Sequence, residues 1–124
     1  MNAKLPNVPI ISITPVGSRV TCNPAPTNTD DDYLVFVDAS NLQEFLNECV
    51  FHSNYDFGGS FHGKDHKAAN SVFYSLKSGE INLIVTDKEW FNRRFLAASS
   101  LAKHFNLLEK SDRVRLFQAV LYGN

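Results

Sequence analysis

The sequence predicts an α+β domain in which a small mixed β-sheet packs against helices, and three features lead to this class. The first is an apolar run of strand length at residues 33–37. The second is a pair of β-rich segments, residues 72–76 and 81–85, on either side of a Ser78-Gly79 turn, which is typical of a hairpin. The third is that apolar residues recur at helical spacing in three other segments.

The first forty residues are expected to contain two strands and a loop. Residues 10–13 are rich in strand formers and run into a Pro-Val-Gly sequence, so a short strand should end there. Residues 21–29 are mostly Pro, Asn and Thr, which favours a loop. Residues 33–37 are apolar without alternation, so we expect a strand that is buried on both faces.

A helix and a long loop are expected next. Ser40 and Gln43 match a capping box, which predicts a helix over about residues 41–51. Residues 53–70 carry glycines and polar side chains and should form a loop. Part of this loop nearly spells a phosphate-binding P-loop, but Asp65 stands where that motif needs a metal-binding hydroxyl. We therefore interpret it as a surface loop, with a lid over the site as the alternative.

Two helices are expected after the hairpin. Thr86 and Glu89 match a second capping box, which opens a helix whose apolar residues step by four and three. Ser111 or Asp112 should cap the last helix, and Gly123 should end it.

The composition restricts the class of protein. The chain has 124 residues, so we expect residues 1–124 to form a single domain. A net charge of −1 supplies no general positive field for long DNA or RNA, which favours a small substrate or a locally gripped nucleic acid. Cys22 and Cys49 are expected to be reduced thiols of a cytoplasmic protein. The apolar stretch at residues 8–16 is too short to span a bilayer, so no membrane association is expected.

Three consecutive aspartates stand directly before the apolar strand. Because side chains alternate along a strand, Asp30 and Asp32 should share one face and Asp31 should point to the other. Two ionised carboxylates on one face repel each other unless a cation lies between them, and Mg²⁺ prefers oxygen ligands. A solvated acidic turn would be the ordinary interpretation of an isolated triplet.

A Gly-Ser-Arg sequence precedes the aspartates. Gly17 lets the backbone approach a ligand closely, Ser18 offers a hydroxyl and an N–H, and Arg19 could add charge-assisted contacts. Alone, such a sequence is more often only a turn. Together with the aspartates, it predicts a phosphate-binding turn followed by a metal-binding pair.

This combination resembles the signature of the DNA polymerase β-like nucleotidyltransferase superfamily: Gly17-Ser18, a spacer, then Asp30-x-Asp32 entering an apolar strand. Members normally have a third carboxylate at the start of a later strand, and Glu80 resembles it, although aspartate is commoner there. More narrowly, the chain is similar to small stand-alone nucleotidyltransferase-like proteins of bacteriophages, which would work in the host cytoplasm.

The resemblance implies a nucleotidyltransferase fold and an enzyme that moves a nucleoside monophosphate from an NTP onto an acceptor hydroxyl. Two Mg²⁺ ions, or Mn²⁺, are implied as cofactors. The implied catalytic and metal-binding residues are Asp30, Asp32 and Glu80. The implied nucleotide-binding residues are Gly17, Ser18, Arg19 and, on the helix after residue 86, Lys103.

The sequence leaves several alternatives open. The acceptor could be a small molecule, a protein or an RNA end, and two copies could pair as a homodimer. A second hypothesis is a non-catalytic module that uses the same fold to bind a nucleotide or a partner protein. A third, weaker hypothesis is a protein that acts on nucleic acid, against which the negative net charge argues.

Overall fold

The computed structural model describes residues 4–27, 30–57 and 72–123, and in this part of the chain five strands form one mixed sheet. The strands, in sheet order, are β1 (Ser12–Val16), β2 (Asp31–Phe36), β5 (Ile81–Thr86), β4 (Tyr74–Ser78) and β3 (Asp56–Phe57). β2 and β5 are parallel, and the other neighbouring pairs are antiparallel. The helices are α1 (Ser18–Thr21), α2 (Ala39–His52), α3 (Glu89–His104) and α4 (Lys110–Tyr122).

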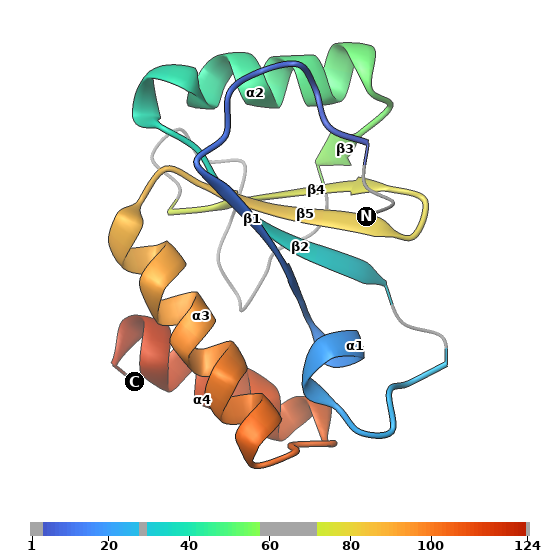
Figure 1. Ribbon diagram of the computed structural model, residues 1–124, viewed down its shortest axis with the longest axis vertical. Coiled ribbons are helices and arrows are strands. Elements are labelled where there is room, and N and C mark those ends of the chain that lie inside the picture. The colour runs from blue at the N-terminus through green and yellow to red at the C-terminus, as the bar shows by residue number, and fades with distance from the viewer. Residues whose placement is uncertain (1–3, 28–29, 58–71, 124) are drawn as a thin grey trace.

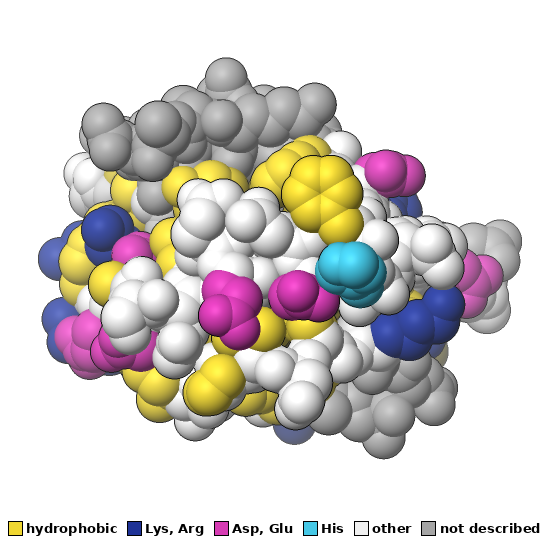
Figure 2. Space-filling model, turned by 90° about the horizontal axis from the view of Figure 1, so that it is seen from above, with side chains coloured by type: hydrophobic (Ala, Val, Ile, Leu, Met, Phe, Trp, Pro, Cys, Tyr) yellow, Lys and Arg dark blue, Asp and Glu magenta, His cyan; other side chains and the backbone are white. Residues whose placement is uncertain are grey.

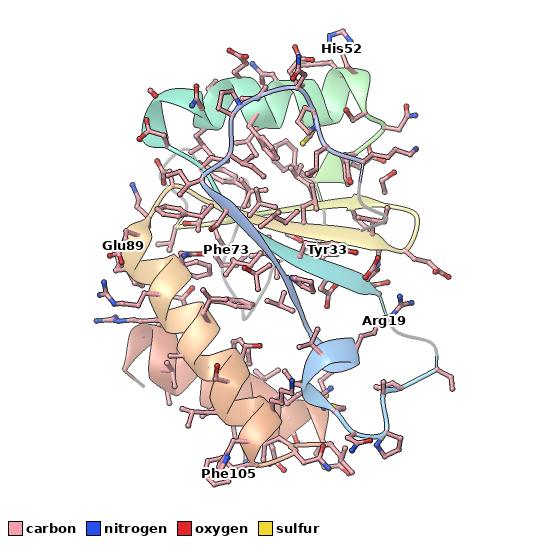
Figure 3. All side chains as sticks on the ribbon, viewed as in Figure 1. Arg19, Tyr33, His52, Phe73, Glu89 and Phe105 are labelled. Carbon is pink, nitrogen blue, oxygen red and sulfur yellow. The ribbon has the colours of Figure 1, made fainter. Side chains whose placement is uncertain are left out.

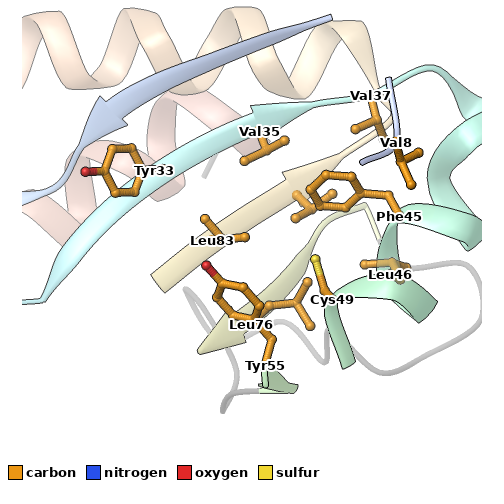
Figure 4. Packing of buried hydrophobic residues seen from close by; sticks show 11 residues of the cluster. Val8, Tyr33, Val35, Val37, Phe45, Leu46, Cys49, Tyr55, Leu76 and Leu83 are labelled. Carbon is orange, nitrogen blue, oxygen red and sulfur yellow. The ribbon is translucent and has the colours of Figure 1, made fainter. Parts of the chain in front are cut away.

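Helices cover both faces of the sheet, with α2 on one face and α3 and α4 on the other (Figure 1). Under α2, Val35 and Leu83 of the central strands pack with Phe45 and Cys49 of the helix (Figure 4). On the opposite face, the core consists of alternate strand residues and the inner sides of α3 and α4, among them Leu34, Ile84, Phe91, Phe95 and Phe117. The expectation that residues 33–37 are buried on both faces is therefore confirmed in its main part.

The helix starts differ from the predicted capping boxes. Asp38, rather than Ser40, is the N-cap of α2, and its carboxylate accepts hydrogen bonds from the Ser40 backbone N–H and hydroxyl. Lys88 is the N-cap of α3, without a side-chain cap. Thr86 is buried; its hydroxyl donates to the Val72 carbonyl and accepts from the Lys88 backbone N–H, so it forms a turn before α3 instead of capping the first turn of the helix.

The remaining elements agree with expectation in part. The first strand lies at Ser12–Val16 instead of residues 10–13; it is an edge strand, where a proline is tolerated because no neighbour needs its N–H. α4 begins after Glu109, which makes no side-chain cap, so neither Ser111 nor Asp112 has the expected role. The hairpin around Gly79 and the end of the last helix at Gly123 are confirmed.

Two short elements were not predicted. α1 is one helical turn directly after β1, and β3 lies inside the segment expected to be a loop. The P-loop-like stretch of that segment lies outside the described residues.

The outer surface over α2 carries acidic, apolar and neutral side chains near its centre, whereas Lys and Arg lie toward its edges (Figure 2). This face therefore shows no broad basic area among the described residues. No helix in the described ranges has the length and apolarity required to cross a membrane.

The central position of β5 predicts an unequal response to two leucine truncations. Leu83 is 0% exposed, so Leu83→Ala should lower the free energy of unfolding by about 3 kcal/mol through lost burial and a residual cavity. Leu108 is 54% exposed, and Leu108→Ala should cost less than about 1 kcal/mol. Urea unfolding of both variants measures the difference; equal losses would contradict the described core.

Candidate functional site

A cavity of about 390 Å³ lies between the sheet and the α3–α4 layer. Its polar wall on the strand side consists of the Gly17-Ser18 turn with Asp30, Asp32 and Asn82. Its floor is apolar, and α4 closes the far side. The apolar lining residues are Val16, Ile84, Phe95, Val114 and Phe117.

The turn at Gly17 and the second aspartate are in direct contact. The antiparallel register pairs Val16 with Asp32, so the residue after β1 arrives beside the Asp32 carboxylate. Gly17 has φ +84, and a Cβ atom placed on it would lie 2.3 Å from Oδ2 of Asp32. Only glycine avoids both the backbone strain and this clash.

Asp32 is an unusual carboxylate. Burial raises the pKa of its carboxyl group to about 6; the hydrogen bond from Asn82 and the charge of Lys77 oppose this, and Asp30 and Asp31 add to it. Its Oδ1 atom is buried and has no hydrogen-bond partner among the described residues. A buried acceptor oxygen without a hydrogen-bond partner lowers the stability of the fold unless a ligand supplies the missing contact.

Asp30 and Asn82 complete the strand side of the cavity. Lys77 of β4 donates from Nζ to Oδ2 of Asp30 at 2.9 Å. Asn82 is the register partner of Asp32 on the parallel strand β5, so the two side chains share a face. The Asn82 amide oxygen accepts a hydrogen bond from the Ser75 hydroxyl at 3.0 Å, which fixes how the amide is oriented.

Asp31 points away from the cavity, as the strand alternation predicts. Its carboxylate accepts a hydrogen bond from the Tyr33 hydroxyl at 2.9 Å and lies 3.8 Å from the Arg19 guanidinium. Figure 3 shows Arg19 beside the start of β2. Arg19 is also 4.0 Å from the Glu80 carboxylate, so it contacts these two acids and is not among the cavity-lining residues.

Glu80 and Lys103 are two further residues whose positions differ from expectation. The starts of β2 and β5 do meet, since the Asp31 N–H donates to the Glu80 carbonyl at 2.7 Å. However, Glu80 lies in the hairpin turn, its side chain is 86% exposed, and it does not line the cavity. The position beside Asp32 belongs to Asn82, because register partners share a face.

Lys103 is exposed in the last turn of α3 and also lies outside the cavity lining.

Two cationic residues of α4 lie at the cavity but were not predicted from the sequence to belong to the site. Lys110 and Arg113 line the cavity from the first turn of the helix. Arg113 donates from Nη1 to the carbonyls of Leu107 and Leu108, at 2.9 and 2.7 Å, which fixes its charge at the cavity wall. The helical spacing of Lys110 with Val114 and Phe117, which line the same cavity, was the signal that could have placed it there.

The loop after α1 is tied to the corner between α3 and α4. The Asn23 N–H donates to the Asn106 side-chain oxygen at 2.8 Å, and the Asn106 amide donates to the Asn23 carbonyl at 2.9 Å. Cys22 also contacts Arg113 at 3.4 Å. These contacts hold the Gly17-Ser18 turn and the start of α4 at a fixed separation across the cavity.

The residues present fit one divalent cation. Asp30 and Asp32 supply two carboxylates in one cavity, and the buried Oδ1 of Asp32 lacks a partner among the described residues. Mg²⁺ is commonly held by one or two carboxylates, with water or substrate phosphates in its remaining positions. No group of three or more His, Cys, Asp or Glu in the described ranges is placed to hold a metal ion.

The chain is similar in structure to the conserved protein GrpB from Enterococcus faecalis, for which a crystal structure exists. The TM-score is 0.53 at 15% sequence identity, over 92% of this chain and 82% of the other. GrpB has a nucleotidyltransferase-like fold, so the predicted fold class is confirmed. No protein-family model and no curated protein matches the sequence. The likeness to bacteriophage proteins stays a prediction.

The Gly17–Asp32 contact predicts an unequal pair of glycine variants. Gly17→Ala should lower the free energy of unfolding by about 3 kcal/mol, since it adds a clash to a strained φ. Gly79 has φ +60 and open space around its Cβ position, so Gly79→Ala should cost only about 1 kcal/mol. Chemical denaturation measures both; equal costs would mean that Asp32 does not pack on the turn.

The raised pKa of Asp32 predicts how stability depends on pH. Because protonation is favoured in the folded state, Asp32 contributes stability that is complete below pH 3.8 and is lost as pH rises through about 6. Without divalent cations, Asp32→Asn should therefore gain about 1–2 kcal/mol relative to wild type between pH 4 and pH 7.5, after discounting for solvent screening. Unfolding curves at several pH values measure this gain, and parallel profiles would contradict it.

Proposed function

We propose that the cavity binds a nucleoside triphosphate together with a divalent cation, and that the chain transfers the nucleoside monophosphate to an acceptor hydroxyl. The observation that carries this proposal is the Asp32 carboxylate, which is buried against Gly17 beside Asp30 with one oxygen unpartnered among the described residues. A buried carboxylate with a raised pKa in a cavity is typical of a functional site.

Asp30 and Asp32 would hold Mg²⁺ or Mn²⁺, and the phosphates of the nucleotide would complete its coordination. When bound, the ion polarises the reacting phosphate and neutralises charge that develops on pyrophosphate. The two carboxylates suffice for one ion. A second ion, as the resemblance implies, would require Glu80 to turn from its exposed position toward the cavity.

The two charged walls suit a nucleotide chelated to a cation. The strand wall carries the carboxylates, and the α4 wall carries Lys110 and the anchored Arg113. A triphosphate between them would place its negative charge near Lys110, Arg113 and the Gly17-Ser18 turn. The volume lies within the range of small-molecule sites.

The reaction follows the chemistry of phosphoryl transfer. The acceptor oxygen forms a bond to the α-phosphorus, the bond from this phosphorus to the bridging oxygen breaks, and pyrophosphate leaves. The hydroxyl proton must pass to a base, and among the described residues Asp30 and Asp32 are the carboxylates that line the cavity. The chain's contribution is to position the two substrates and to balance the charge of the triphosphate.

A second candidate function is nucleotide binding without transfer, and the identity of residue 82 favours it. An amide, rather than a carboxylate, stands beside Asp32, and its oxygen is engaged by Ser75. Asn82 cannot accept a proton as a carboxylate does. Such a site could bind the nucleotide and cation and still fail to activate an acceptor.

Calorimetry and pyrophosphate release distinguish the two candidates. Wild type should bind a non-hydrolysable NTP in the presence of Mn²⁺, and Asp32→Asn should weaken this binding by about tenfold or more, because a charged ligand is lost. Pyrophosphate release is then measured with natural NTPs and panels of small hydroxyl compounds, proteins and RNA ends. Release that depends on Asp32 supports transfer, whereas tight binding without release supports the binding module.

Asp31→Asn is the matched control, since it removes the same charge one residue away on the opposite face of β2. It should keep nucleotide binding within about threefold of wild type, as expected for a screened charge outside the site. Equal losses in the two variants, or none in either, would contradict the proposed site.

A further inference from the structure

Lys77 holds a carboxylate that the proposed function assigns to a divalent cation. Its Nζ atom donates to Oδ2 of Asp30 at 2.9 Å. The Lys77 and Asp30 side chains are 47% and 42% exposed, respectively, so the ammonium group can leave the carboxylate without crossing the protein interior. An ammonium group and a divalent cation cannot both take the same position on that oxygen.

The sheet register offers Lys77 a second carboxylate. Lys77 lies between Asn82 of β5 and Asp56 of β3, each its direct register partner. Side chains directly opposite in antiparallel strands share a face, with their Cβ atoms about 4.5–5.5 Å apart. Asp56 is exposed and has no ion pair within the described part of the chain. The flexible lysine side chain can therefore reach an acid on either side.

We propose that Lys77 is a displaceable counter-ion of the cation site, which neutralises Asp30 in the absence of a divalent cation and pairs with Asp56 when one binds. The inference rests on the proposed function, because it requires Asp30 to be a cation ligand. Two consequences follow. Lys77 lets Asp30 and Asp32 lie close together without a metal ion, and the affinity for the free cation is reduced by the cost of displacing the lysine.

The test uses Mn²⁺ alone as the probe, without nucleotide, and measures its affinity by calorimetry. Lys77→Met should bind Mn²⁺ about three- to tenfold more tightly than wild type, because a competing and repelling charge is removed. Lys77→Arg, which keeps the charge, should stay near the wild-type affinity. Asp56→Asn should weaken Mn²⁺ binding about twofold, as expected for loss of an exposed alternative pair.

Lys88→Met is the matched control, since it removes an ion-paired lysine of similar exposure, 46%, outside the cavity lining and should leave Mn²⁺ affinity unchanged. If wild type binds Mn²⁺ and Lys77→Met binds it equally or less tightly, the counter-ion role is overturned and the cation site stands. If neither protein binds Mn²⁺, the cation site fails and the inference fails with it. If only Lys77→Met binds, the lysine blocks the site completely, which supports the inference.

Discussion

The contact between the Gly17 backbone and the Asp32 carboxylate is the constraint on which the site depends. β1 and β2 are antiparallel and in a register that brings the end of one strand beside the start of the other. The positive φ of Gly17 turns the chain into α1 at this point, and the missing side chain leaves room for the carboxylate. Asp32 is thereby held in a buried position that raises its pKa, a cost that stability alone does not explain.

The charges around this contact are only partly balanced. Lys77 approaches from β4, and Asn82 donates a hydrogen bond from β5. The cationic wall of α4 stands across the cavity, fixed by the contacts of Arg113 with the α3–α4 corner. An arrangement with carboxylates on one wall and cations on the other complements a ligand that itself carries both signs, as a metal-chelated polyphosphate does.

The sequence predicted the features that local patterns determine. The buried strand, the hairpin at Gly79 and the shared face of Asp30 and Asp32 depend on periodicity and turn chemistry alone, and the structure has all three. The helix starts were wrong because other residues hold the capping positions: Asp38 caps α2 in place of Ser40, and α3 starts after Lys88, two residues beyond Thr86.

The sequence predicted the residues of the site less completely than it predicted the strands and turns. Which β5 residue stands beside Asp32 depends on the strand register, and two positions separate Asn82 from Glu80. Arg19 directly follows the Gly17-Ser18 turn, yet its guanidinium contacts Asp31 and Glu80, which lie outside the cavity lining. Lys110 and Arg113 line the cavity because α4 folds back against α3, a tertiary arrangement that the sequence pattern of α4 does not determine.

A crystal grown with Mn²⁺ and a non-hydrolysable nucleoside triphosphate tests the central claim most directly. The account predicts an anomalous difference peak between the carboxylates of Asp30 and Asp32, with phosphate density beside the Gly17-Ser18 turn. A cavity without a manganese peak in crystals that contain both components, or a peak at other residues only, would contradict it.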